Sequence, residues 1–346
     1  MNAIRVAVIG LGAIAFEHLA KLRSQPRVQV AGVCDLSLTL ASAVAERFGV
    51  GPAYVDHERM LATERPDVVH VLTPPQSHRM LVLAALEAGA HVLVEKPIAV
   101  TLAEYVEMRD AATRRGLLLC ENYNYRFSRG VLAALSAHRR GELGRVVNVD
   151  VTFCGVMAGN GAYADRQVPH FAHALPGGAL QNFASHPISL ALAFLGECEE
   201  AVCVRRRLDP GFPGDDELRA LLRGAGGGCA ALTVSRHARP ARFTLSVQGT
   251  RASAEVDVYA GHMQLDAAES AIAASLRRGV GHLAAGAATT ARAATGRRDA
   301  FEGLATLLDG FYDAVRGGPA PITAAEMDAV NGVLHELLSP TERACE

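Results

Sequence analysis

A short apolar strand that runs directly into a glycine-rich turn is the feature of this sequence that most constrains its fold. The opening residues IRVAVI are followed by GLGAIA and then by a helical pattern. In this G-x-G-x-x-A turn, Gly10 permits a tight bend, Gly12 lets an anion approach the backbone, and Ala15 lets the helix pack closely on the strand. We therefore expect the helix N-terminus, at Ala13 and Ile14, to face the pyrophosphate of a dinucleotide.

A second apolar segment, VQVAGVCD, ends in Asp35. A carboxylate at this place accepts hydrogen bonds from the 2′- and 3′-hydroxyls of an adenosine ribose and repels a 2′-phosphate. The next three residues, LSL, include no Arg that would pair with such a phosphate. The segment therefore favours NAD over NADP, and the alternative is that Asp35 only caps the following helix.

Strand-like and helix-like segments alternate through the first third of the chain. The strand-like segments include DVVHVLTPP, HVLVEKP and LLLCENYNYRF, and helical patterns separate them. This rhythm predicts an α/β fold with a doubly wound parallel sheet, the Rossmann arrangement. Ligands of such sheets bind beyond the carboxyl ends of the strands. Thr73, Lys96 and Asn122 fall at those ends, so we expect them in a ligand site.

The pattern changes after about residue 145, where short segments of alternating polarity are separated by Gly and Pro. They predict a C-terminal α+β domain built on an open, mostly antiparallel sheet. Residues 262–300 are rich in Ala, Gly and Arg and are expected to form a partly ordered excursion, to which we assign no activity. The predicted organisation is a NAD-binding Rossmann domain at 1–125, an α+β substrate and oligomerisation domain at 126–300, and C-terminal helices at 301–346 that pack back on the first domain.

Composition excludes several classes of protein. Half of the 346 residues are hydrophobic and the formal net charge is −2, so no basic surface for nucleic acid is expected. The seven cysteines form no CxxC pair, which is typical of reduced thiols in a cytoplasmic protein. No apolar run approaches the roughly 18 to 20 residues of a membrane span, and because the first residues lack the pattern of a signal peptide, none is expected. We expect a cytoplasmic protein with no membrane or nucleic-acid partner.

Several motifs in the same order together resemble the Gfo/Idh/MocA family, named after glucose-fructose oxidoreductase, inositol dehydrogenase and a rhizopine-catabolism protein. The resemblance covers nearly the whole chain. It rests on the cofactor loop GLGAIA, TPPQSH (73–78), VEKP (94–97), NYNYRF (122–127), PGGALQNFASHPISLALAFLG (176–196) and GTRASAEVD (249–257).

The resemblance implies an NAD(P)-dependent oxidoreductase that acts on a hydroxyl or ketone of a sugar, sugar derivative or cyclitol, and a homodimer or homotetramer. It implies that Lys96 lies near the reacting oxygen, that Glu95 and Pro97 fix it there, and that the Lys96–Pro97 peptide is often cis. Partial desolvation beside a nicotinamide would lower the pKa of such a lysine. The alternative is a surface lysine in a salt bridge. The turn motif implies cofactor contacts from Thr73, Pro74 and His78, besides Glu95 and Lys96.

The second catalytic motif departs from the family pattern of Asp, three residues, His, two residues, Asp. The corresponding residues are Asn182, His186 and Ser189. An amide can hydrogen-bond a substrate hydroxyl, but it cannot exchange a proton as a carboxylate does. We expect His186 to be the general acid/base, with Asn182 beside it on one helix at residues 179–195, unless Pro187 kinks that helix or makes it begin at His186. A packed histidine without a catalytic role is the alternative.

Further polar residues are candidates for substrate binding. Tyr163, His170 and His173 lie in a long segment that is expected to border the substrate. Asn122 and Arg126 are candidates to hold its oxygens, and the alternative for Arg126 is an ion pair with a carboxylate. The spacing of the two histidines could also suit a metal, but no carboxylate or cysteine stands at a helpful distance, so no metal is expected.

Three other functions stay open. Lys96 and His186 would also serve a biosynthetic ketone or imine reductase acting on a non-sugar metabolite. Some relatives retain NAD during glycoside hydrolysis without net redox change. Asn182, in place of a carboxylate, also leaves room for a non-catalytic NAD-binding regulatory protein.

Overall fold

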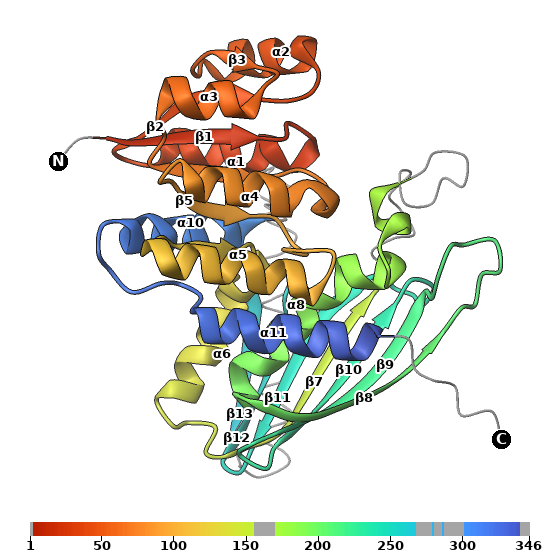
Figure 1. The fold of residues 1–346 in the computed structure, drawn as a ribbon. Helices are drawn as coiled ribbons and strands as arrows, with labels where there is room; N and C mark the ends of the chain where they lie inside the picture. Colours follow the sequence, from red (N-terminus) through yellow and green to blue (C-terminus); the bar gives the residue numbers. More distant parts are fainter. Residues whose placement is uncertain (1–2, 156–169, 268–278, 280–285, 287–300, 340–346) are drawn as a thin grey trace. The chain divides into compact units, whose positions relative to one another are not determined.

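The computed structural model describes residues 3–155, 170–267, 279, 286 and 301–339. The chain divides into two compact units, and each unit takes in two segments of the sequence (Figure 1). The first unit comprises Met1–Asn122 and Leu304–Asp328, and the second comprises Tyr123–Gly303 and Ala329–Glu346. Most of helix α10 (Glu302–Val315) thus belongs to the first unit, whereas most of the last helix, α11 (Ala324–Leu338), belongs to the second.

The first unit is built on a six-stranded parallel sheet in the order β3-β2-β1-β4-β5-β6. This order places the carboxyl ends of β1 and β4, which are neighbours in the sheet but not consecutive in the chain, at a topological switch point. The strands are apolar because both faces of the sheet are covered. They are β1 (Ile4–Ile9), β2 (Val28–Cys34), β3 (Ala53–Tyr54), β4 (Val68–Val71), β5 (His91–Val94) and β6 (Leu119–Glu121).

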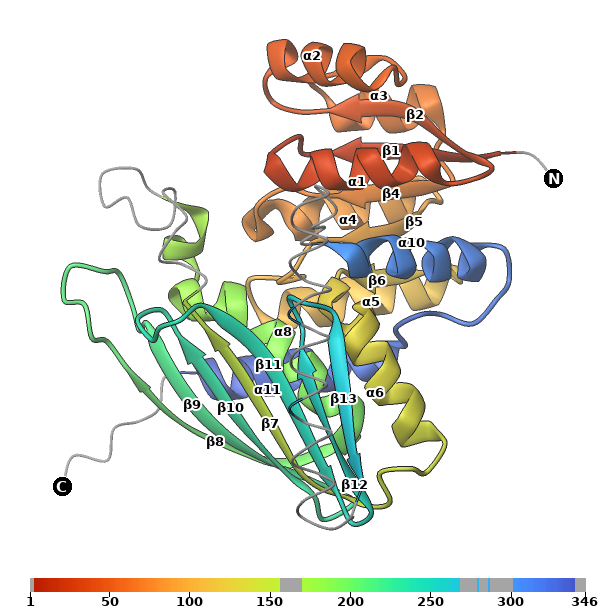
Figure 2. The same ribbon diagram turned by 180° about the vertical axis from the view of Figure 1, so that it is seen from behind.

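Helices cover both faces of this sheet: α3, α4 and α5 stand in front of it in Figure 1, and α1 and α10 in Figure 2. Local signals fix several of their ends. Thr101 and Glu104 form a capping box at the start of α5, and Asp56 caps α3. The helices are α1 (Ala13–Ser24), α2 (Leu38–Phe48), α3 (His57–Glu64), α4 (His78–Glu87), α5 (Leu102–Arg115) and α10 (Glu302–Val315), with the 3-10 turn η1 (Pro75–Ser77).

The second unit is built on a seven-stranded sheet in the order β13-β12-β11-β7-β10-β9-β8, in which only the central β7 and β10 pair in parallel among the described strands. One face of this sheet is buried by α8, which packs on β7, β9 and β10. The strands are β7 (Val146–Cys154), β8 (Cys198–Arg206), β9 (Glu217–Gly224), β10 (Cys229–Ser235), β11 (Arg242–Gly249), β12 (Ala252–Asp257) and β13 (His262–Ala267).

The remaining elements of the second unit are mostly helical. The helix α8 (Gly178–Leu195) is buried almost throughout, and α6 (Arg129–Arg139) packs against β12 and β13. Two 3-10 turns, η2 (Asn124–Phe127) and η3 (Phe171–Ala174), precede them in the chain. The last helix, α11 (Ala324–Leu338), has residues in both units.

The predicted fold class is confirmed in both units, with two local corrections. The strand expected over LLLCENYNYRF ends at Glu121, and η2 follows it, because the polar and aromatic residues after it turn the chain away from the sheet. His262–Ala267, expected within an irregular excursion, forms the edge strand β13 through backbone pairing with β12. Its side chains are only partly buried, so its sequence carried little apolar signal. The later part of that predicted excursion lies almost wholly outside the described residues.

None of the described helices combines the length and the apolar character that crossing a membrane requires.

Candidate active site

The glycine-rich turn after β1 leaves the N-terminus of α1 open. Gly10 has φ +89°, and a Cβ there would come within 2.7 to 2.9 Å of Thr73 and Leu72, so only glycine fits the bend. Gly12 is the N-cap residue of α1 without any side-chain cap, and a Cβ on it would meet nothing within 4 Å. Gly12 and Ala13 are exposed, and Ile14 is half-buried. The residues present therefore fit a pyrophosphate at this helix N-terminus.

The carboxylate of Asp35 stands beside this turn, at the end of β2. Its Oδ2 accepts a hydrogen bond from Leu11 N at 2.9 Å, and its Oδ1 accepts one from Ser37 N at 3.0 Å. The cap of α2 is Ser37 itself, whose Oγ accepts from Leu40 N. Asp35 is half-buried and is thus held in a fixed place with part of its surface open, as a ribose-binding carboxylate requires.

The turn after β4 is held together by its own polar groups. Ser77 Oγ donates to Thr73 Oγ1 at 2.8 Å, and Pro74 is exposed. His78 is fully buried, with Nε2 2.7 Å from Thr73 O and Nδ1 3.1 Å from Ile98 O. Burial lowers the pKa of His78, against the opposing effect of these carbonyls. His78 thus ties the turn after β4 to the segment after β5, instead of presenting its ring at the surface.

Lys96 follows β5 and is half-buried. The Lys96–Pro97 peptide is cis, as the family resemblance implied. Burial lowers the pKa of Lys96 below the usual lysine value, and the carboxylates of Glu95 and Glu121 oppose this shift. An amine with a lowered pKa can polarise a substrate oxygen or exchange a proton nearer neutral pH than a solvated lysine.

Glu95 connects Lys96 to the interior of the first unit. Its Oε1 accepts a hydrogen bond from Asn122 Nδ2 at 2.5 Å and lies 3.3 Å from His18 Nε2, and its Oε2 accepts from Lys96 N at 3.3 Å. Burial alone would raise the pKa of Glu95, but the hydrogen bond of His18, with the contributions of Lys96 and Asn122, holds it below its usual value. The predicted residues Glu95, Lys96 and Asn122 are therefore neighbours at the carboxyl edge of the sheet.

In the second unit, Asn182 and His186 lie on α8, both buried. The helix runs unbroken through Pro187, so the alternative in which it begins at His186 is wrong. The ring of His186 meets that of Tyr125 edge to face, with centroids 4.7 Å apart, and that of Phe153 at 6.3 Å. His186 is thus bordered by aromatic faces.

The other candidate residues of the second unit are in or near the 3-10 turns. Arg126 lies in η2 and is 9% exposed. His170 precedes η3 and accepts a hydrogen bond from Ala172 N, while the ring of His173 meets Phe212 at 4.9 Å. Tyr163 lies outside the described residues.

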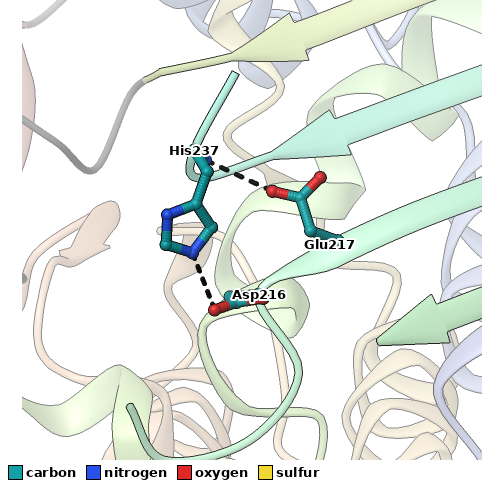
Figure 3. Close-up of side chains that lie close together, drawn as sticks. All are labelled: Asp216, Glu217 and His237. Atoms are coloured by element: carbon teal, nitrogen blue, oxygen red, sulfur yellow. Dashed lines mark hydrogen bonds and ion pairs between the residues drawn. The ribbon is translucent and has the colours of Figure 1, made fainter. Parts of the chain in front are cut away.

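One group of potential metal ligands that the sequence did not single out is found in the second unit (Figure 3). The carboxylate of Asp216 accepts from Leu208 N and Asp209 N and lies 2.8 Å from His237 Nε2, while Glu217 accepts from Ser235 Oγ and His237 N. Asp216 thus holds the loop before β9, and Glu217 ties the start of β9 to the end of β10, so both carboxylates have structural roles.

Four residues near the predicted site were missed. Tyr125 borders His186, while His18, His70 and Tyr312 lie behind Glu95 in the first unit. The only signal for the two histidines is a polar residue in an otherwise apolar run, as in VVHV. A hollow of about 530 Å³ beside Leu22, Val28 and Phe48 lies at the opposite, amino edge of the sheet and holds none of the predicted residues.

Residues 4–123 match the family described as "Oxidoreductase family, NAD-binding Rossmann fold", and residues 131–255 match the "GFO/IDH/MocA C-terminal domain". The chain belongs to the Gfo/Idh/MocA family. Its relatives include proteins that are named dehydrogenases and oxidoreductases. Trans-1,2-dihydrobenzene-1,2-diol dehydrogenase of Bos taurus is 30% identical over 258 residues, which cover 73% of this chain and 74% of the relative.

Two further relatives match over shorter stretches. D-glucoside 3-dehydrogenase of Escherichia coli (strain K12) is 32% identical over 199 residues, which cover 56% of this chain and only 55% of that relative. A protein of Akkermansia muciniphila named glycosyl hydrolase family 109 protein 2 is 32% identical over 181 residues, which cover 47% of this chain and 38% of the relative.

Solved structures share the fold. Levoglucosan dehydrogenase in complex with NADH and levoglucosan has a TM-score of 0.72 at 25% identity and covers 78% of each chain. The WlbA dehydrogenase of Bordetella pertussis, with NADH and UDP-GlcNAcA, has a TM-score of 0.79 at 22% identity and covers 97% of this chain and 94% of that one.

Proposed function

We propose that this protein is an NAD-dependent dehydrogenase that moves a hydride between nicotinamide C4 and a hydroxyl-bearing carbon of a sugar, sugar derivative or cyclitol. The observation that carries the proposal is Lys96, an amine whose pKa burial lowers, at the carboxyl edge of a Rossmann sheet. The named activities of the relatives support a sugar or a cyclic diol as the class of substrate.

The first unit would hold NAD. The open N-terminus of α1 at Gly12 would take the pyrophosphate, and Asp35 would accept from the ribose hydroxyls. Thr73 and Pro74 would border the cofactor, with His78 holding their turn in place. When bound, NAD supplies the hydride acceptor for the oxidised carbon.

The chemistry left to the protein is proton transfer and the stabilisation of charge on the substrate oxygen. We propose that Lys96 donates a hydrogen bond to that oxygen and that His186 accepts the hydroxyl proton as the carbon loses its hydride. Asn182, an amide, would orient the substrate through hydrogen bonds without taking a proton. In the reverse direction, the same groups return the proton to a ketone oxygen.

The remaining candidates would contact the substrate. Asn122 and Arg126 would do so through their polar groups, and we propose the same for His170, His173 and Tyr163. We also propose a cytoplasmic homodimer or homotetramer. The exposed apolar side chains of Val202, Val204 and Leu221 on β8 and β9 support an assembly through that sheet.

The test is Lys96→Ala, assayed with both cofactors across a panel of sugars, glycosides and cyclitols. We expect kcat to fall by about 10² to 10⁴, the usual contribution of a positioned acid/base group. The Kd for NADH, measured by fluorescence, should change by less than about threefold because the phosphates and ribose are held elsewhere. Lys21→Ala, at the only other lysine of the chain, is the control. Near-normal turnover of the Lys96 variant would refute the proposal.

A second candidate is an NAD-dependent glycoside hydrolase without net redox change, favoured by the match to the Akkermansia muciniphila protein. Product analysis separates the two. A ketosugar formed together with one equivalent of NADH supports the dehydrogenase. A released sugar at an unchanged oxidation level, with the cofactor retained on the protein, supports the hydrolase.

A further inference from the structure

Four side chains of the first unit form a hydrogen-bonded line from α10 through β4 and α1 to the residue before Lys96. Tyr312 Oη lies 2.8 Å from His70 Nε2, His70 Nδ1 lies 3.0 Å from His18 Nδ1, and His18 Nε2 lies 3.3 Å from Glu95 Oε1. Three of these side chains are wholly buried, and Glu95 is 8% exposed. We call these four residues the Tyr312–Glu95 network.

Core packing does not account for this network. On α1, His18 shares the buried face with the apolar side chains of Ala15, Leu19 and Leu22, and His70 stands within the apolar strand β4. An apolar side chain at either position could pack against the sheet and would need no hydrogen-bond partner. A buried polar group does need one, because leaving it unpaired costs about 1 to 3 kcal/mol. The two histidines therefore add nothing that the fold itself requires.

With both histidine rings neutral, one set of proton positions satisfies every contact of the network. Burial keeps the pKa of Tyr312 high, so its hydroxyl stays protonated and can donate to His70 Nε2. Burial lowers the pKa of His70 well below its usual value, so that ring is neutral. With the Tyr312 hydroxyl donating to Nε2, its proton is on Nδ1. His70 Nδ1–H then donates to His18 Nδ1, which leaves the His18 proton on Nε2, facing Glu95.

The carboxylate of Glu95 is suited to accept a hydrogen bond from this His18 Nε2–H group. Its oxygens already accept from the Asn122 amide and from Lys96 N, so all its near neighbours donate and the carboxylate is the form that satisfies them. The ionisable groups that act on it are His18 from α1, His78 from α4 and Lys96. The ionisable groups that act on Lys96 are Glu95 and Glu121.

We infer that the Tyr312–Glu95 network is a positioning device, in which two buried histidines hold the Glu95 carboxylate, in its charged form, beside Lys96. Tyr312, His70 and His18 touch neither the substrate nor the reacting atoms in this scheme. They act on the amine through Glu95, whose charge favours the ammonium form of Lys96. Only the catalytic meaning of this inference rests on the proposed function, because the proton positions and the Lys96 titration are properties of the protein alone.

The proton positions can be measured on the wild-type protein by ¹⁵N NMR of its histidine rings, with His18→Asn and His70→Asn used to assign the signals. We expect His18 to be protonated on Nε2 only and His70 on Nδ1 only at neutral pH. A His18 ring without a proton on Nε2, or a His70 ring protonated on Nε2, would overturn the inference. This measurement on the wild type needs neither turnover nor a stable Tyr312 variant.

The effect on the amine can be measured because the chain has only two lysines, Lys21 and Lys96. After reductive ¹³C-methylation, Lys96 gives one titrating signal, identified by its loss in Lys96→Ala. In Tyr312→Phe, the His70 ring loses its donor and the Glu95 charge is held less firmly, so we expect the Lys96 midpoint to move down by about 0.5 to 1 pH unit. Tyr105→Phe removes the hydroxyl of another buried tyrosine, which donates to Asp328 instead, and should leave the midpoint unchanged.

A Lys96 midpoint that does not move in a folded Tyr312→Phe protein would show that the network is only structural. In an active enzyme, the high-pH limb of kcat/KM should move down with the midpoint, while KM for NADH stays within about twofold. If the tautomers and the midpoint behave as expected but Lys96→Ala keeps its turnover, the proposed function fails and the network stands.

Discussion

The predicted catalytic groups of the two units differ in their surroundings. In the first unit, Lys96 adjoins Glu95, which is bound by an amide and an imidazole and connected to further buried polar groups. In the second unit, His186 stands against the rings of Tyr125 and Phe153. Hydrogen-bonded charges fix a protonation state, whereas aromatic neighbours mainly fix the plane of a ring. The arrangement suits an amine that keeps its state and an imidazole that changes it during the reaction.

The largest effect expected from this comparison is that of His186→Ala. We expect kcat to fall by about 10² to 10⁴ and one limb of the pH–rate profile to disappear, because the group that takes the proton is gone. NADH binding should be retained. His138→Ala is the control, since His138 also lies against an aromatic ring in the second unit, that of Phe194, but has no proposed role. An unchanged pH–rate profile would remove His186 from the mechanism and leave Lys96 as the only proton carrier.

An intermediate effect is expected from two glycines of the same turn. Gly10→Ala places a Cβ against Thr73 at a positive φ, so we expect the free energy of unfolding to fall by at least about 2 kcal/mol. Gly12→Ala meets nothing within 4 Å and should keep the stability of the wild type. If Gly12 borders the pyrophosphate, however, the Kd of the Gly12→Ala variant for NADH should be about ten- to a hundredfold higher than that of the wild type. The stabilities of the two variants are measured by denaturant unfolding, and their NADH affinities by titration. If Gly12→Ala binds NADH as tightly as the wild type, the pyrophosphate does not bind at this turn.

The smallest effect concerns Asp35. Asn at this position keeps an oxygen that can accept from Leu11 N or Ser37 N but loses the charge that repels a 2′-phosphate. A charge repulsion of about 1 kcal/mol at the surface predicts that Asp35→Asn improves NADPH binding relative to NADH by about fivefold. The measurement is the ratio of the two Kd values. A ratio that does not change would mean that Asp35 only braces the turn.

The sequence was sufficient for the parts of the fold that local signals determine. The bend at Gly10 and the apolar strands of the first unit depend on neighbours within a few residues, and they were predicted correctly or nearly so. Lys96 could be singled out because a strand and a proline fix its place. The edge strand β13 was missed because its pairing with β12, and not its composition, makes it a strand.

The polar interior of the first unit could not be predicted in the same way. His18, His70 and Tyr312 come from three elements, and 242 positions separate the last two residues in the chain. Each of these residues is ordinary in its own segment, and only their shared environment gives them a role. Helix α8 shows a related limit, because the apolar packing around it tolerates Pro187 inside the helix, where the residue alone suggested an end or a kink.

The discontinuous make-up of the first unit affects how the protein is synthesised. The sheet is complete by residue 122, but α10, which carries the tyrosine that meets His70, leaves the ribosome after almost the entire second unit. A nascent Rossmann sheet must therefore wait, with one buried imidazole still lacking its hydroxyl partner, until α10 has been synthesised. Early termination of translation anywhere before α10 would yield a nucleotide-binding half whose interior is unfinished.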